Sequence, residues 1–324
     1  MAPFLELVDL ASERLGASVI VANDDFFAPK ENLIKPTAPI WIEGKYTDRG
    51  KWMDGWETRR RREPGHDWCV VRLALPGRIR GLDVDTAFFT GNYPESCAID
   101  ACRLADGVED LVHADWREIV PRSILKGNEH NLLDADGDEV ATHVRLRIFP
   151  DGGVARLRVY GDVAVDRARL SAVGDVDLAS VVNGGLVVAA SDMFFGSRHN
   201  LIMPGDAVNM GDGWETKRRR GPGHDWTVIR LGAPGTLARA IVDTRHFKGN
   251  APGSCSLEGC VEADWQVGQW RELLPQSPLS PDTVHEFADL RSVGGVAWVR
   301  LNIFPDGGVA RLRLFGRVST GGSR

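Results

Sequence analysis

One short segment of the chain concentrates residue types that move protons. The stretch DGWETRRRREPGHDW at 54–68 holds Glu57, His66 and Asp67 around a run of basic residues. Histidine and carboxylate side chains exchange protons near neutral pH. Gly55, Pro64 and Gly65 in the same stretch are turn formers, which predicts a shaped loop leading into a strand. The segment is a candidate catalytic loop, with these three ionisable residues as candidate catalytic groups.

The same segment also holds residues suited to binding a small acid. Arg60 and Arg61 each present a guanidinium fork that matches a carboxylate, and Trp56 is a candidate wall that would exclude water. Each residue has a commoner explanation. A basic run is usually a solvated face, an isolated His-Asp pair a structural hydrogen bond, and tryptophan a core residue. The density of turn formers, carboxylates, His and Arg together favours a site.

This segment occurs twice in the chain. DGWETKRRRGPGHDW at 212–226 supplies the counterparts Glu215, Arg218, Arg219, His224 and Asp225. Further matches keep the same order, including VDLAS at 8–12 and 176–180 and IFPDGGVARLR at 148–158 and 303–313. Self-similarity of this kind indicates an internal duplication. We expect one repeat over 3–163 and a second over 174–318, with about ten extra residues in the first, around Pro36 to Arg49.

Four further pairs of matched residues are weaker candidates. Asn92 and Asn250 follow glycine in matched turns and have amides that can contact a substrate, although a plain β-turn explains them equally well. The strand arginines lie opposite apolar residues, which predicts a solvent-facing position for Arg145, Arg156, Arg300 and Arg311. His130 and His285 are also matched, but no neighbouring motif gives them a role.

The elements that must position these residues are β-strands. Val144, Leu146 and Ile148 alternate with arginines, and similar period-two runs are separated by Pro/Gly turns, as in antiparallel strands with one buried face. The PDGG turn at 150–153 predicts a hairpin between its flanking strands. Many short strands per repeat favour an all-β chain of two β-sandwiches or jelly rolls over a barrel. Only the N-terminal stretch reads as a short amphipathic helix, with Phe4, Val8, Ala11 and Leu15 on one stripe.

Composition excludes several classes of function. The 324 residues carry a net charge of −6, which disfavours binding to nucleic acid or to an acidic membrane. No apolar run is long enough to span a bilayer, and no secretory signal is recognisable. The signatures of covalent serine catalysis, phosphate loops and dinucleotide binding are missing. The five cysteines lack the spacing of a local disulfide or a zinc knuckle, which predicts a reducing cytoplasm.

The quoted strings also resemble a known family. KWMDGWETRRRR followed by PGHDW, then FFTGNYPESC and RLRIFPDGG, is similar to allantoicase over essentially the whole chain. The resemblance implies two tandem jelly-roll domains of the galactose-binding-like type and the hydrolysis of allantoate to ureidoglycolate and urea. It also implies a homo-oligomer acting on a small-molecule substrate. Lys217 and Gly221 depart from the first copy, so the two loops are unequal.

The implied chemistry assigns roles to the candidate residues. Allantoate carries one carboxylate and two ureido groups on its central carbon, so its cleavage needs an anion clamp and proton transfer. We expect Arg60 and Arg61, or Arg218 and Arg219, to bind the carboxylate, and Asn92 to contact a ureido group. His66 with Asp67, and Glu57, would transfer protons. The mismatches between the copies favour the first repeat as the main contributor.

Two other functions remain possible from sequence. Jelly-roll pairs also occur as carbohydrate-binding modules, in which exposed tryptophans stack on sugars, and a third possibility is a scaffolding protein. No cofactor is predicted and no metal site is assigned. A divalent metal held by His66, Asp67 and Glu57 stays open, because no complete set of ligands with recognisable spacing appears.

Overall fold

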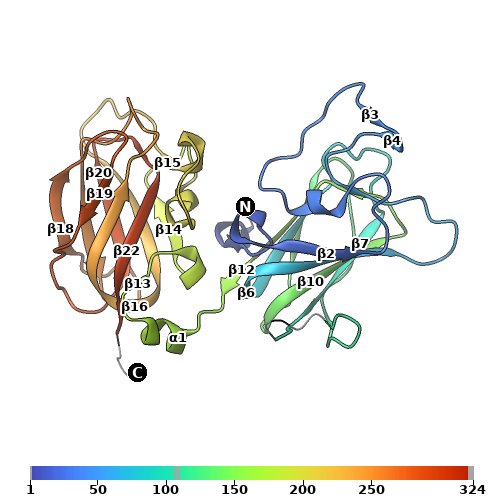
Figure 1. Cartoon of the computed structure of the whole chain (residues 1–324), viewed down its shortest axis with the longest axis horizontal. Helices are drawn as coiled ribbons and strands as arrows, with labels where there is room; N and C mark the ends of the chain where they lie inside the picture. The colour runs from blue at the N-terminus through green and yellow to red at the C-terminus, as the bar shows by residue number, and fades with distance from the viewer. Residues whose placement is uncertain (1, 106, 108–109, 320–324) are drawn as a thin grey trace. The chain divides into compact units, whose positions relative to one another are not determined.

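A computed structural model describes residues 2–105, 107 and 110–319, and the chain divides into two compact units, residues 1–164 and 165–324. Each unit is a β-sandwich built from one copy of the duplicated sequence, as Figure 1 shows. The prediction of an all-β chain of two repeats is confirmed. The two units are called the first and the second repeat below.

The first repeat contains twelve strands and three short 3-10 turns among its described residues. The strands are β1 (Val8–Asp9), β2 (Ser18–Ala22), β3 (Tyr46–Thr47), β4 (Gly50–Lys51), β5 (Trp56–Glu57), β6 (Asp67–Asp85), β7 (Ser96–Cys102), β8 (Arg117–Ile124), β9 (His130–Asp134), β10 (Val140–Phe149), β11 (Gly153–Val154) and β12 (Arg156–Val163). The turns are η1 (Pro3–Glu6), η2 (Glu13–Leu15) and η3 (Lys30–Ile34).

The second repeat has ten strands, one helix and three 3-10 turns in its described part. These are α1 (Arg167–Val173), β13 (Val176–Asp177), η4 (Val181–Asn183), β14 (Leu186–Ala190), η5 (Arg198–Ile202), η6 (Met210–Asp212), β15 (Trp214–Glu215), β16 (Asp225–Asp243), β17 (Ser254–Cys260), β18 (Arg271–Pro278), β19 (Val284–Phe287), β20 (Val296–Phe304), β21 (Gly308–Val309) and β22 (Arg311–Val318). Most of the stretch between the two predicted repeats, 164–173, is helical, and Asp166 caps α1 by accepting the N–H of Arg169.

The long strand β6 belongs to both layers of the first sandwich. Its first half pairs with β2 and β10, and β7 and β8 continue that layer. Its second half pairs with β12 and β9, and β1 completes the other layer. In the second repeat β16 has the same position between β14, β20, β22 and β19. Each repeat is therefore a sandwich whose two layers share one continuous strand.

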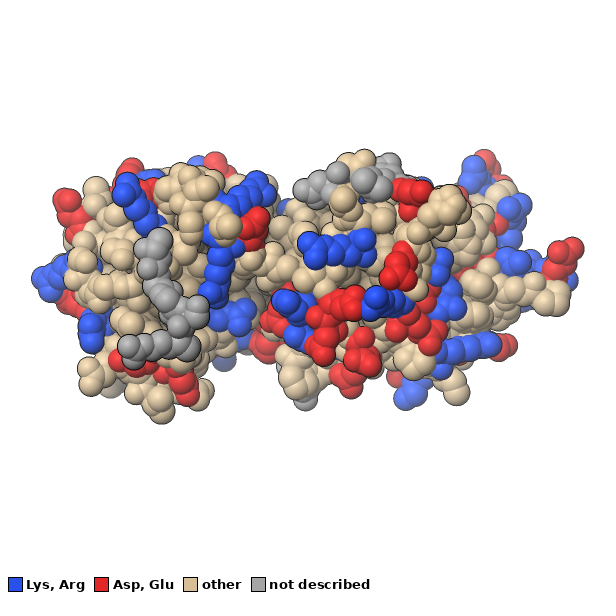
Figure 2. Space-filling view, turned by 90° about the horizontal axis from the view of Figure 1, so that it is seen from below, with Lys and Arg blue, Asp and Glu red and all other residues tan. Residues whose placement is uncertain are grey.

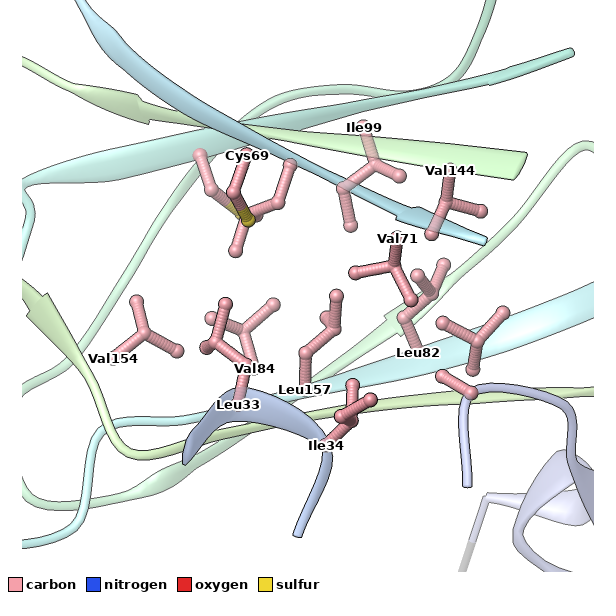
Figure 3. Packing of buried hydrophobic residues seen from close by; sticks show 14 of the residues in the cluster. Leu33, Ile34, Cys69, Val71, Leu82, Val84, Ile99, Val144, Val154 and Leu157 are labelled. Atoms are coloured by element: carbon pink, nitrogen blue, oxygen red, sulfur yellow. The ribbon is translucent and has the colours of Figure 1, made fainter. Parts of the chain in front are cut away.

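Alternation along these strands builds the core. Val71, Ile99 and Val144 from one layer pack against Val84 and Leu157 from the other, as Figure 3 shows, and all five side chains are fully buried. Because successive strand residues point to opposite faces, the residues between them lie on the outer faces of the sandwich. This alternation places polar side chains on the outer faces of the sandwich.

The PDGG turn does not close a hairpin, contrary to the sequence prediction. β10 and β12 both pair with β6, which lies between them, and the intervening β11 pairs with β5 instead. Gly152 in this turn has φ +140°, and a Cβ there would lie 2.7 Å from the backbone nitrogen of Pro94. The turn therefore crosses from one layer to the other and holds the Asp54–Trp68 loop.

Two further sequence predictions are corrected. The N-terminal stretch is not one amphipathic helix, because β1 interrupts it and pairs with β12, with the Asp9 carboxylate accepting the N–H of Val159. His130 and His285 are not equivalent. His130 lies opposite Asp85 in β6, whereas Val284 lies opposite the corresponding Asp243 in β16.

The surface charges and the free cysteine thiols agree with what the composition predicts. Basic and acidic side chains are mixed on the face shown in Figure 2. All five cysteines are free, as the sequence spacing predicts, and all five are buried. Among the described residues, no helix is both long and apolar enough to cross a bilayer.

Candidate functional site

The loop over Asp54–Trp68 is anchored at both ends by strand contacts. β5 pairs with β11, and Thr58 donates its backbone N–H to the Gly152 carbonyl at 3.1 Å. Gly65 has φ +148°, and a Cβ at this position would lie 2.7 Å from Nη2 of Arg61. The glycine therefore lets the loop close over an arginine side chain.

That arginine forms a buried ion pair. Nη1 of Arg61 lies 2.7 Å from Oδ1 of Asp67, which is only 2% exposed and also accepts from the Asn23 amide at 2.7 Å. In the second repeat Arg219 pairs with Asp225 in the same way. Arg61, Arg219, Asp67 and Asp225 thus connect the loop to the end of the long strand, which gives each of them a structural contact.

His66 and Asp67 do not form an acid–base couple. They are consecutive residues at the start of a strand, so Asp67 points inward, and His66 lies against the Phe149 ring at 5.0 Å between centroids. Burial and the positive charges of Arg147, Arg61 and Arg145 lower the pKa of His66, which favours the neutral imidazole. His224 occupies the equivalent position, with its ring 4.6 Å from that of Phe304.

Trp56 belongs to the core and not to a binding wall. Its side chain has no exposed surface, and Nε1 donates to the Asp24 carbonyl at 2.8 Å. Trp214 has the same burial and donates to the Asp192 carbonyl at 2.8 Å. A buried indole without exposed area cannot contact a ligand, so the more common explanation of tryptophan is correct here.

The structure brings together two predicted residues that are far apart in sequence. Nδ2 of Asn92 donates to Oε1 of Glu57 at 2.7 Å, and Asn250 donates to Glu215 at 2.5 Å. Burial raises the pKa of Glu57, and the hydrogen bond from Asn92 offsets this only in part. Glu57 is therefore better able than an ordinary glutamate to carry a proton near neutral pH.

Arg60 and Arg218 are exposed, and within the described ranges no carboxylate pairs with either guanidinium. In contrast, Arg156 and Arg311 are buried, although alternation predicts a solvent-facing position. Nη2 of Arg156 lies 2.7 Å from Oδ2 of Asp54, and Nη2 of Arg311 lies 2.8 Å from Oδ2 of Asp212. The first aspartate of each DGWET segment thus neutralises a buried arginine.

In the second repeat His224 faces an open cavity of about 420 Å³, here called the His224 cavity. It lies on the outer face of β16, β17, β18 and β20, and its polar lining includes Ser256, Glu258, Glu272, Arg300 and Asn302. Nε2 of His224 lies 3.2 Å from Oδ1 of Asn302, whose Nδ2 donates to Glu258 at 2.8 Å. Arg300 donates to Glu258 through Nε at 2.8 Å.

An arginine occupies the corresponding place in the first repeat. Arg147 stands where the second repeat has Asn302, and its Nη2 binds Asp100 and Glu118, both at 2.7 Å. Asp100 also binds Nη2 of Arg145 at 2.7 Å. Sequence analysis missed Asn302, although the contrast between RLRIFPDGG and RLNIFPDGG was visible when the copies were aligned.

The sequence left a divalent metal site open. Within residues 2–105, 107 and 110–319, no three His, Cys, Asp or Glu side chains are grouped so that they could hold a metal ion.

Comparisons with known proteins give a consistent result. The model of the family described as "Allantoicase repeat" matches residues 8–164 and 176–319. A probable allantoicase of Photobacterium profundum is 51% identical, covering 97% of each chain, and one of Pseudomonas syringae pv. syringae is 48% identical, covering 98% of each. The crystal structure of allantoicase from Saccharomyces cerevisiae is 40% identical, with a TM-score of 0.82 over 95% of this chain and 92% of that one.

Proposed function

This chain belongs to the allantoicase family and hydrolyses allantoate, and we propose that its second repeat binds the substrate in the His224 cavity. The observation that carries this location is the open cavity beside His224, one of the predicted catalytic residues. A non-catalytic pair of carbohydrate-binding modules is not favoured, because the relatives that match the full chain are allantoicases.

The reaction needs balanced proton transfers. The leaving ureido nitrogen takes a proton, the C–N bond breaks with its electron pair passing to the departing urea, and the remaining ureido nitrogen gives up its proton. Its lone pair then forms a C=N bond. Water adds to that carbon and the nitrogen recovers a proton, which gives ureidoglycolate. A group that both accepts and donates protons is therefore required beside an anion-binding group.

The lining of the His224 cavity supplies these groups. Arg300 uses Nε and Nη2 for Glu258, and its remaining N–H groups can bind the substrate carboxylate. Glu258 and Asn302 offer acceptors and a carbonyl oxygen for ureido N–H groups. His224 moves the proton, since a tautomer with the hydrogen on Nε2 toward Asn302 leaves Nδ1 as the basic nitrogen.

The loop residues that remain available have supporting roles in this proposal. Exposed Arg60 and Arg218 attract the substrate anion. The Glu57–Asn92 and Glu215–Asn250 pairs offer a carboxyl and an amide to a ureido group. The protein works in a reducing cytoplasm as a homo-oligomer, which the five free buried thiols support for the compartment. Light scattering of the purified chain tests the oligomer.

Separate alanine variants of the two matched histidines test the location. H224A should lower kcat for urea release from allantoate by about 100-fold, in the range for losing a proton-transfer group. H66A is the matched control, because the charged Arg147 stands near His66 where the second repeat has Asn302, and its kcat should change several-fold at most. Wild-type turnover in H224A would contradict the role of His224 and would move the chemistry to the carboxylates.

A further inference from the structure

The first repeat has a cavity of its own on the other layer of the sandwich. This His130 cavity has a volume of about 330 Å³ and lies on the outer face of β6, β9 and β12. Its polar lining includes Asp83, Asp85, His130, Arg158 and Tyr160. Ala38 and Pro39, from the insertion that only the first repeat carries, form part of its wall. Its volume is in the range of small-molecule pockets.

One buried polar atom at this cavity has no partner. Asp83 is 6% exposed, and its Oδ2 lies 2.7 Å from Nδ1 of His130, but its Oδ1 has no hydrogen-bond partner among the described residues. Nη1 of Arg158 lacks a hydrogen bond within the described part of the chain but lies 3.7 Å from Oδ2 of Asp9, an ion-pair contact. Buried polar groups are nearly always satisfied in folded proteins, so the unpaired carboxylate oxygen of Asp83 points to a polar group bound in the cavity.

The charge state of the cavity suits a polar ligand. Burial raises the pKa of Asp83, and the contact with His130 offsets this in part. Burial alone would lower the pKa of His130, but the hydrogen bond and charge of Asp83 raise it overall. His130 stands at the mouth of the cavity, with 69% of its side chain exposed. The cavity thus offers a carboxylate, an imidazole that protonates readily, a guanidinium and a phenol.

The second repeat keeps two of these residues, as Arg313 and Asp243, and differs at the other polar positions. Ile241 stands in place of Asp83, Val284 in place of His130 and Phe315 in place of Tyr160. Arg245 replaces Ala87 and fills the space, binding Asp243 and Asp206 through Nη2, both at 2.7 Å. Asp83, His130 and Tyr160 are therefore not a requirement of the fold, since the same sandwich forms without their counterparts.

We propose that the His130 cavity binds a small ureido acid, a molecule with a ureido group and a carboxylate. The carboxylate of Asp83 accepts the ureido N–H groups, and the guanidinium of Arg158 and the hydroxyl of Tyr160 bind the ligand's carbonyl or carboxylate oxygens. This assignment rests on the proposed function, because allantoate and ureidoglycolate are the ureido acids that the reaction supplies. The chain would then hold two such sites, one in each repeat.

Calorimetric titration of the full chain with N-carbamoylglycine tests this proposal. This ureido acid has no second urea to lose, so it reports binding without turnover. The wild-type chain should bind two molecules. A87R places in the first repeat the arginine that fills the second, where it can pair with Asp85, and D83I installs the residue that the second repeat carries. Each should weaken one of the two binding events about tenfold or more, as expected for losing a charge-assisted hydrogen bond.

Two controls make the result decisive. R245A opens the corresponding space in the second repeat without supplying counterparts of Asp83 and His130, so it should add no binding event. N302R closes the His224 cavity and should remove the other event. Thermal unfolding of each variant checks the fold, and D83I gives an independent measurement if A87R unfolds. Competition by allantoate and by ureidoglycolate then identifies which of the two occupies the His130 cavity.

The outcomes separate this proposal from the proposed function. Two binding events that survive both A87R and D83I would overturn the His130 cavity as a ureido-acid site, while allantoate turnover by the wild-type chain would stand. If A87R and D83I each lose one binding event while N302R keeps the wild-type number of events, the His130 cavity is supported and the His224 cavity is refuted as the substrate site.

Discussion

The two repeats share a framework but differ in which cavity is open. In the second repeat Asn302 leaves the His224 cavity open, and in the first repeat Arg147 fills the same place. On the other layer the arrangement is reversed, since Arg245 fills the space that Ala87 leaves open in the first repeat. In each layer one arginine on the outer face occupies the space that the other copy leaves open.

The framework explains why such exchanges are tolerated. Each repeat keeps the same buried pairs, Arg61–Asp67 and Arg156–Asp54 in the first and their counterparts in the second. These pairs hold the loop and the long strand, whereas the cavity residues lie on outer faces, where alternation places them away from the core. A change there leaves the packing between the layers intact.

The largest effect is expected from breaking the shared framework. D54A leaves the buried Arg156 without its carboxylate and should reduce the free energy of unfolding by about 3–5 kcal/mol. D212A should cost less, because the Asp212 side chain is 12% exposed and that of Asp54 is 6% exposed. Guanidinium unfolding of both variants measures the difference. Equal, small losses would show that the pairs contribute little and that the framework lies elsewhere.

The next largest effect is expected from exchanging Asn302 and Arg147. Asn302 leaves the His224 cavity open in the second repeat, and Arg147 fills the same place in the first. N302R can pair with Glu258 and Glu272, as Arg147 pairs with Asp100 and Glu118, and should lower kcat/KM for allantoate by about 100-fold, roughly 2.7 kcal/mol. Adding R147N in the same chain opens the first repeat. Activity should stay low, because Ala98 and Asp100 stand there in place of Ser256 and Glu258. Recovery of turnover in the double variant would mean that the copies are interchangeable.

The smallest effect is expected from the buried carboxyl of Asp9, in the layer of the first sandwich that contains β1 and β12. Burial raises the pKa of Asp9 from 3.8 to about 6, Arg158 and two backbone N–H groups lower it, and Asp83 adds a further rise. The folded state keeps a proton that the unfolded chain releases above pH 3.8, so the contribution of Asp9 to stability falls as pH rises through this window. The loss should not exceed about 3 kcal/mol, the limit that a pKa change from 3.8 to about 6 sets.

Substitution and titration test this contribution. D9N should flatten the pH dependence of unfolding between about pH 4 and 6, as measured in guanidinium. D83I should lower the pKa of Asp9, as followed by carbon NMR, because it removes the neighbouring carboxylate that raises it. The second repeat is the matched reference, since burial raises the pKa of Asp177 while Ile241 stands in place of Asp83. An unchanged Asp9 titration in D83I would contradict the influence of Asp83.

The sequence was a good guide wherever the interactions are local. Alternation correctly predicted that Val71, Val144 and Leu157 lie in the core, because the pattern of apolar residues along each strand shows which face is buried. The duplication was readable for the same reason, since it needs only a comparison of one stretch with another. The turn residues of the loop also predicted its sharp path, and Gly65 has the positive φ that this path requires.

The errors concern pairings between distant residues. No local pattern shows that β6 separates β10 from β12, so the PDGG turn was misread as a hairpin. Arg156 looked solvent-facing because the loop that brings Asp54 over it is a hundred residues earlier in the chain. The shift between His130 and Val284 arose from matching residue types without knowing the register of the strands.

The strand β6 also determines how the first repeat opens. Its 19 residues, Asp67–Asp85, donate and accept backbone hydrogen bonds in both layers, so neither layer can separate without disturbing it. Its central amides should therefore exchange with solvent deuterium only through global opening, whereas those of the two-residue strands β3 and β4 should exchange by local fraying. Each sandwich would then melt as a single cooperative unit and not layer by layer.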